Sequence, residues 1–172
     1  PNIAGNLLVA SSRISGGGTP GISDTLTNTW TQLASVAVGS AKETSWYCLN
    51  CKAGANTVTV TGTGTIYIGI AEYAGVDTII GSTATASGSG SAAYSVGPVT
   101  PTVSPSVVIS TMANESANGL TFTGLTPASQ TIVLPGSGNG NALLFEFHAI
   151  TTSAVTIAGT ANFATSWGGA IA

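Results

Sequence analysis

Residues 57–70 read TVTVTGTGTIYIGI, and apolar side chains alternate in them with hydroxyl-bearing or small ones. Two valines stand between threonines, and three isoleucines are separated by a tyrosine and a glycine. A period of two with β-branched residues is typical of an antiparallel strand that buries one face. The glycine-rich segment 62–64 between the two runs predicts a turn. This part of the chain therefore predicts two neighbouring β-strands.

The same alternation recurs along the chain, and no window combines a helical period with caps and sufficient length. Many short strands with regular turn spacing indicate a sandwich or a barrel. We therefore predict an all-β fold, a two-sheet antiparallel β-sandwich of jelly-roll or immunoglobulin-like type with about 10–13 short strands. The expected strands cover residues 6–12, 29–38, 43–49, 56–61, 65–73, 78–85, 91–97, 105–112, 119–124, 130–134, 142–150, 153–158 and 165–171.

The length of 172 residues suits one domain, which we expect to span residues 1–172. Pro98, Pro101 and Pro105 fall within eight residues. Because proline cannot donate to a strand ladder, this segment predicts a crossover between sheets or an exposed edge. A boundary between two domains is the alternative interpretation.

Charge is scarce in this chain. Only 3 residues are Lys or Arg and 6 are Asp or Glu, whereas 26 Thr, 20 Ser and 23 Gly are present. The charged share of 5% compares with roughly 25% in an ordinary soluble domain. Hydroxyl groups and amides must therefore keep the surface soluble, which suits a protein outside the cell or packed against copies of itself. So few titratable groups argue against most enzymes, and we expect neither catalysis nor a cofactor.

The basic residues and the apolar runs exclude two kinds of partner. Arg13, Lys42 and Lys52 are too few to neutralise a phosphate backbone, so we expect no nucleic-acid binding. The longest apolar runs, 66–70 and 143–147, are far shorter than the ~20 residues of a membrane span.

Cys48 and Cys51 are the only cysteines. A zinc site would need a second pair or clustered histidines, and His148 is the lone histidine. If residues 48–51 form a turn, the two Cα atoms come within ~7 Å and a small-loop disulfide can form. That disulfide would place the chain in an oxidising compartment. Two free buried thiols are the alternative.

Two pairs of titratable residues are candidates for chemistry, but each has a structural explanation that we prefer. Glu72 and Asp77 could ligate Ca²⁺ or act as paired acids; structurally, they end a strand and begin a turn. Glu146 and His148 project from the same face of one expected strand, but no Gly-x-Ser-x-Gly nucleophile elbow accompanies them. The triplet 114–116, Asn-Glu-Ser, matches an N-glycosylation acceptor.

Four aromatic residues are candidates for a sugar-binding platform: Trp46, Tyr47, Tyr67 and Tyr73. Adjacent residues on a strand face opposite ways, so one of the first two is expected to be exposed. Packing in the core is the alternative for each of the four, and Trp30 and Trp167 are expected as core anchors.

Seven segments of the chain carry a resemblance to a known kind of module: 4–10 (AGNLLVA), 23–24 (SD), 27–32 (TNTWTQ), 45–47 (SWY), 54–60 (GANTVTV), 71–77 (AEYAGVD) and 167–172 (WGGAIA). Together they resemble the Thr/Ser/Gly-rich β-sandwich modules, immunoglobulin-like or jelly-roll-like, of large secreted bacterial and viral surface proteins. Such modules serve as stalks, adhesins, carbohydrate-binding appendages and virion parts, and no catalytic residue set accompanies the resemblance.

Modules of this kind usually have a further strand before the first of these segments, whereas only three residues precede it here. Either the chain is a piece of a longer polypeptide, or the sandwich lacks an edge strand, which a neighbouring copy can supply by strand addition. Head-to-tail addition that does not close makes a filament. The residues of this expected edge are Asn6, Leu7, Leu8, Val9 and Ala10.

These observations predict a non-enzymatic structural module at the cell surface, outside the cell or on a virion. It would assemble with its own kind into a filament, a pilus-like appendage or a surface layer. The alternative is a carbohydrate-binding module or adhesin that holds a surface polysaccharide on the aromatic platform.

Overall fold

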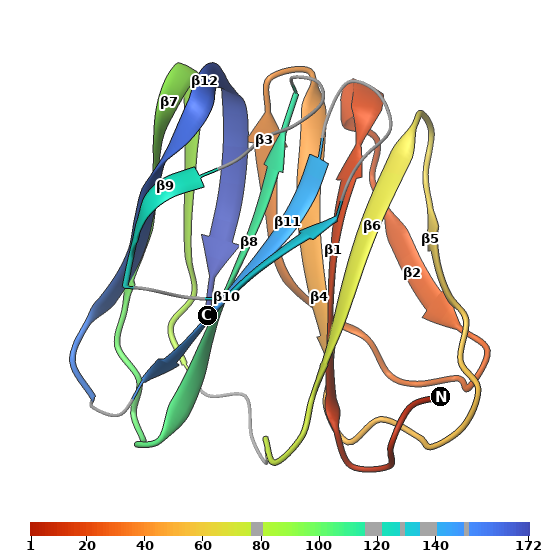
Figure 1. The fold of residues 1–172 in the computed structure, drawn as a ribbon. Coiled ribbons are helices and arrows are strands. Elements are labelled where there is room, and N and C mark those ends of the chain that lie inside the picture. Colours follow the sequence, from red (N-terminus) through yellow and green to blue (C-terminus); the bar gives the residue numbers. More distant parts are fainter. Residues whose placement is uncertain (77–80, 116–121, 128–129, 135–140, 150–151) are drawn as a thin grey trace.

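The computed structural model describes residues 1–76, 81–115, 122–127, 130–134, 141–149 and 152–172 (Figure 1). These residues form twelve β-strands and the short 3-10 helix η1 (Ser15–Gly17), and no helix in the described ranges is long and apolar enough to cross a membrane. The strands are β1 (Leu7–Ile14), β2 (Gly21–Asp24), β3 (Thr31–Val38), β4 (Ala41–Cys48), β5 (Val58–Thr61), β6 (Ile66–Tyr73), β7 (Ala84–Val99), β8 (Ser106–Asn114), β9 (Phe122–Thr126), β10 (Gln130–Leu134), β11 (Asn141–Ala149) and β12 (Val155–Ile171).

The first sheet has the strand order β3-β4-β1-β6, and every pairing in it is antiparallel. Its two central strands, β1 and β4, are buried on both faces. One face carries Leu7, Val9 and Glu43, and the other carries Leu8 and Trp46. The small β2-β5 sheet and its flanking segments lie on the second face, where Trp30 packs on the Leu8–Cys48 cluster.

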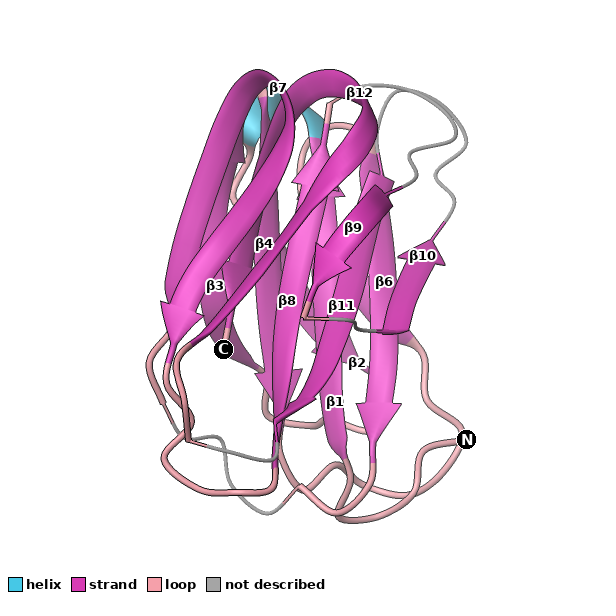
Figure 2. Cartoon of the chain, turned by 60° about the vertical axis from the view of Figure 1, so that its left-hand side comes forward, coloured by secondary structure: helices cyan, strands magenta, loops and turns pink. Residues whose placement is uncertain are grey.

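The second sheet has the order β10-β11-β8-β12-β7, and it folds back on itself. Figures 1 and 2 show β7 and β12 arching over together at one end of the molecule. The second half of β12 pairs with β8, whereas the first half pairs with β9. Register shifts in β12 between Thr160 and Trp167 mark the bend. The folded sheet thus supplies two layers. One layer contains β10, β11, β8, the second half of β12 and the first half of β7. The other contains the first half of β12, the second half of β7 and β9.

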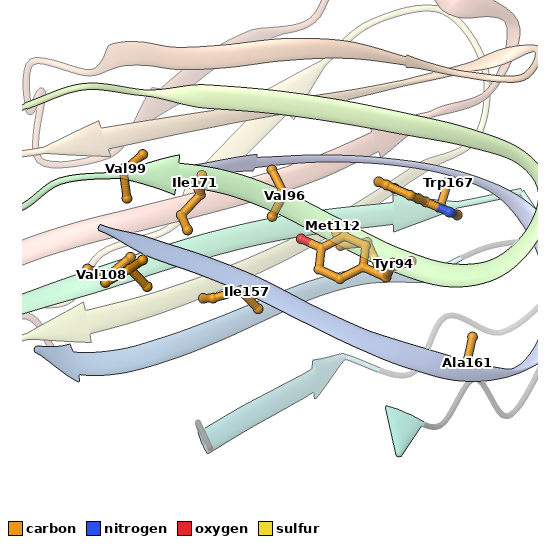
Figure 3. Close-up of a cluster of buried hydrophobic side chains, with 10 residues drawn as sticks. Tyr94, Val96, Val99, Val108, Met112, Ile157, Ala161, Trp167 and Ile171 are labelled. Atoms are coloured by element: carbon orange, nitrogen blue, oxygen red, sulfur yellow. The ribbon is translucent and has the colours of Figure 1, made fainter. Parts of the chain in front are cut away.

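A large apolar cluster fills the space inside this fold (Figure 3). Tyr94 and Trp167 meet edge to face there, with their ring centroids 4.9 Å apart. The Tyr94 hydroxyl lies 2.7 Å from Ser110 Oγ, which donates to the Ala170 carbonyl. The other members are Val96, Val99, Val108, Met112, Val155, Ile157, Ala161 and Ile171.

Successive side chains of β8 point to opposite faces of the strand, so β8 packs against both sheets. Val108 and Met112 point into the fold of the second sheet, whereas Ile109 and Ala113 face the first sheet. Ile109 packs on Leu7 and Val9 of β1. The described chain is therefore a layered stack in which β8 has apolar contacts on both faces.

The prediction of an all-β antiparallel sandwich is confirmed. Two details of the strands differ from expectation. The expected strands 91–97 and 165–171 are parts of the longer strands β7 and β12, because the Gly-Ser segment 87–90 bends a continuous strand instead of ending it. The strand β2 was not expected. The proline-rich segment after β7 does not cross between sheets, because it connects β7 to β8 of the same folded sheet.

Candidate functional site

The expected strand-addition edge is wrong. Most of the segment that contains Asn6, Leu7, Leu8, Val9 and Ala10 lies in β1, an interior strand of the first sheet. Leu8 to Ile14 pair with β4 on one side, and Leu7 to Ile14 pair with β6 on the other. Asn6 is itself buried, and its backbone carbonyl accepts a hydrogen bond from Cys51 N at 2.9 Å. The chain supplies both neighbours of this strand, so no groove remains there for a neighbouring copy.

The first sheet instead ends in β6, which pairs with β1 alone among the described strands. Its eight residues run in unbroken register with β1, from Ile66 opposite Ile14 to Tyr73 opposite Leu7. They include no proline, lysine or arginine. Natural edges are usually blunted by such residues or by bulges. The edge of β6 is therefore regular, and it carries none of these blunting residues.

The other strands at sheet ends are less regular. β3 has a register shift between Gln32 and Ala34. β7 is bent and contains Pro98, and β10 is only five residues long. Among the described edges, β6 is the best template for another strand.

Exposed apolar side chains gather near this edge. Ile70 on β6 is 38% exposed, and Ile3 is 65% exposed. The Glu72 carboxylate connects the two regions, because its Oε1 accepts hydrogen bonds from Ile3 N at 2.8 Å and from Asn6 Nδ2 at 2.9 Å. This supports the structural interpretation of Glu72, which holds the first residues of the chain against the end of β6.

The four platform aromatics do not form one exposed surface. Trp46 is buried at 3% exposure and points to the β2-β5 side of the first sheet. Tyr47 and Tyr73 face the opposite side and pack on the Leu7–Val9–Ile109 cluster. The Tyr67 ring lies beneath the Arg13 guanidinium, and Arg13 Cζ is 5.7 Å from the ring centroid. Core packing, the alternative that the sequence left open, fits this arrangement.

Cys48 and Cys51 are free thiols, so the predicted disulfide is not formed. Both are buried and pack with Leu8 and Trp30. Cys51 Sγ lies 3.3 Å from the Ile3 carbonyl, to which it donates a weak hydrogen bond. Burial raises the pKa of both thiols, which keeps them protonated and unreactive.

The remaining candidates form no reactive site among the described residues. Asp77 lies outside the described residues, as do the side chains of Glu146 and His148. Asn114, of the glycosylation triplet, is fully buried at the end of β8, which leaves no room for a glycan on the folded chain. In the described part, no three His, Cys, Asp or Glu side chains cluster as metal ligands would.

A buried polar cluster between the two sheets was not anticipated from the sequence. Glu43 of β4 is 0% exposed and accepts a hydrogen bond from Ser11 Oγ at 3.3 Å. Ser45 and Thr111 are also 0% exposed, and each presents a hydroxyl to the same interface. Glu43 Oε2 and both of these hydroxyls have no hydrogen-bond partner among the described residues. The segment 41–48 does not alternate in polarity, which was the available signal that both faces of this strand are covered.

Comparison of the chain with protein-family models, with curated proteins and with solved structures finds no match. The site therefore has to be interpreted from its own geometry.

Proposed function

We propose that this protein is a non-enzymatic structural subunit that assembles with copies of itself by adding strands at the edge of β6. The observation that carries the proposal is the regular eight-residue register of β6 at the end of the first sheet. Backbone N–H and C=O groups on such an edge bind an extended partner strand.

The occupant that we propose is β3 of a second copy. The first sheet has four antiparallel strands, so its two end strands β3 and β6 run in opposite directions. If a second copy is translated across the sheet, perpendicular to the strands, its β3 lies antiparallel to β6 of the first copy. Strand direction then continues to alternate from one copy to the next. Because the two joined edges are different surfaces, the contact does not close and a filament grows.

Charge and exposure favour a copy of the same chain as the partner. β3 carries no charged residue, and Glu72 is the only charged residue of β6. The apolar surface of Ile70 would be removed from water on contact, which contributes roughly 25 cal/mol per Å². Repulsion between identical subunits is weak because the net charge is only −3.

An extracellular or cell-surface location belongs to this proposal. The resemblance to modules of secreted surface proteins and the hydroxyl-rich composition support it. The carbohydrate-binding alternative has lost its main support, because the four aromatic residues do not share an exposed face.

The test is assembly of the purified protein, followed by sedimentation and electron microscopy, with Ile70→Lys as the variant. A lysine at the edge is expected to raise the concentration needed for assembly on the order of tenfold, about 1.4 kcal/mol. Val103→Lys is the matched control, because Val103 is exposed at 53% between β7 and β8, away from β6.

Filaments that are lost in Ile70→Lys and kept in Val103→Lys would support the proposal. A wild-type protein that stays monomeric at high concentration would contradict it. Discrete dimers would contradict the pairing of β3 with β6, since they require a closed contact.

A further inference from the structure

We propose that Glu43 is a pH-sensitive contact between the two sheets: as a neutral acid it permits their close packing, and its ionisation at alkaline pH loosens them. This inference is independent of the proposed assembly, because Glu43 lies inside the subunit and not at the edge of β6.

The position of Glu43 makes its charge state matter. β4 lies over β8, and Ala41 packs on Val38 and Ala113 beside the acid. The carboxyl is completely removed from water, with one oxygen bonded to Ser11 and the other without a partner among the described residues. A neutral carboxyl can occupy such a place at moderate cost, whereas an unpaired carboxylate there is strongly unfavourable.

Arg13 is the nearest cation, and its orientation does not relieve that cost. It stands directly opposite Glu43 in the β1–β4 register and is 5% exposed. Its guanidinium, however, points away from β4 and lies over Tyr67 of β6, the strand on the opposite edge of β1. The Nε of Arg13 has no hydrogen-bond partner in the described part of the chain. No ion pair between Arg13 and Glu43 is therefore built into the interface.

Two other described ionisable groups near Glu43 titrate outside the relevant range, and the side chains of Glu146 and His148 on β11 lie outside the described part of the chain. Tyr94 lies behind β8, and burial raises the pKa of its hydroxyl far above neutrality. Glu115 follows β8, and hydrogen bonding from Ser40 lowers the pKa of its carboxyl. The strands β3, β8 and β12 and the helix η1 carry no ionisable side chain.

The pKa of Glu43 agrees with this geometry. Burial raises it from 4.5 to about 8. The hydroxyl of Thr111, which is near the carboxyl but outside hydrogen-bonding geometry, and the hydrogen bond from Ser11 oppose the increase. Between these two values the folded protein holds a proton that the unfolded chain has released. Stability must therefore fall as pH rises from 4.5 to about 8, and remain at its lower level above that.

The experiment compares the melting temperature of the wild type and Glu43→Gln from about pH 5 to 9, across the window that linkage defines. The uncharged amide keeps the shape of the acid and can donate to the hydroxyls of Ser45 or Thr111. We expect the wild-type melting temperature to fall with pH and the variant to lose this decline, so that the variant melts higher at pH 9. Glu72→Gln, at an exposed carboxyl, is the matched control and should keep the wild-type decline.

Two results would overturn the inference. Parallel pH profiles of wild type and Glu43→Gln would show that the acid does not carry the dependence. A flat wild-type profile would show that Arg13 turns and neutralises the carboxylate. If Glu43→Gln fails to fold, NMR titration of ¹³C-labelled glutamate carboxyls in the wild type decides: one midpoint near 8 is expected, and the inference fails if all lie near 4.5.

Discussion

Glu115 connects the turn between β3 and β4 to the end of β8. Its Oε1 accepts hydrogen bonds from the backbone N–H of Ser40 and from Ser40 Oγ at 2.6 Å. The turn residue Gly39 has φ +56° and lies against the same carboxylate, so a side chain there would collide with it. Glycine is required at this position both by its backbone conformation and by the close approach.

We predict that Glu115→Gln weakens the protein at neutral pH and not in acid. Hydrogen bonding from the Ser40 hydroxyl and the charge of Arg13 lower the pKa of Glu115 below 4.5. The contribution is therefore present above 4.5 and is lost as pH falls through the lowered value. Because the group is at the surface and partly accessible to water, we expect a loss of at most about 1 kcal/mol at pH 7 by urea denaturation. Equal losses at pH 7 and pH 3 would contradict this account.

At the residue scale, Glu43 lowers the stability of the protein at high pH, and Glu115 lowers it at low pH. The raised pKa of the buried acid Glu43 makes stability fall as pH rises, and the lowered pKa of the partly buried acid Glu115 makes it fall as pH falls. The protein is therefore expected to be most stable under mildly acidic conditions.

At the scale of elements, β12 depends on two adjacent glycines. A Cβ on Gly168 would lie 2.8 Å from Val38 Cγ2, and one on Gly169 would lie 2.7 Å from the Thr111 carbonyl oxygen and 2.9 Å from Tyr94 Oη. The pair lets the strand approach β3 on one face and Tyr94 on the other. Real Cβ contacts are rarely so short, so the packing of the two layers requires these glycines.

Gly169→Ala is predicted to destabilise the fold by about 1–3 kcal/mol, because a backbone carbonyl on β8 cannot move aside as a flexible side chain could. The measurement is chemical denaturation, and Ala164→Ser is the control, since it adds one atom at an exposed position of the same strand. If Gly169→Ala loses no more unfolding free energy than Ala164→Ser, then β12 can move away from β8 at little cost and this account is wrong.

The alternation of polarity was sufficient to predict most strands and their antiparallel character, because half-buried strands such as β5 have one polar face. The resemblance to surface-protein modules misplaced β1 at an edge, because strand order depends on pairings between distant segments that no local pattern reports. The alternation also missed the buried role of Glu43, since a charged residue beside Lys42 reads as a solvated position. The sequence predicted a turn where β7 only bends, because glycines such as Gly88 and Gly90 are common both in turns and in bent strands.

At the scale of the whole molecule, the scarcity of charge predicts that assembly is insensitive to salt. The screening length is about 10 Å at 0.1 M ionic strength, and few charges on this surface lie close enough to others for screening to matter. We expect the assembly concentration to change less than about twofold between about 0.05 and 0.5 M NaCl, measured by light scattering. A change of tenfold or more would show that charged groups control the contact.

The arch formed by β7 and β12 has a consequence for how the chain folds. The interior of the second sheet needs Val155 beside Val99 and Ile171 beside Ala84, so its pairings join segments synthesised far apart in time. Segment 155–171 must leave the ribosome before the Tyr94–Trp167 core can close, and until then β8 lacks its neighbour. Loop closure over such distances is slow, so folding on a scale of milliseconds to seconds is expected. The nascent chain would have to remain soluble with its apolar strands unpaired throughout that interval.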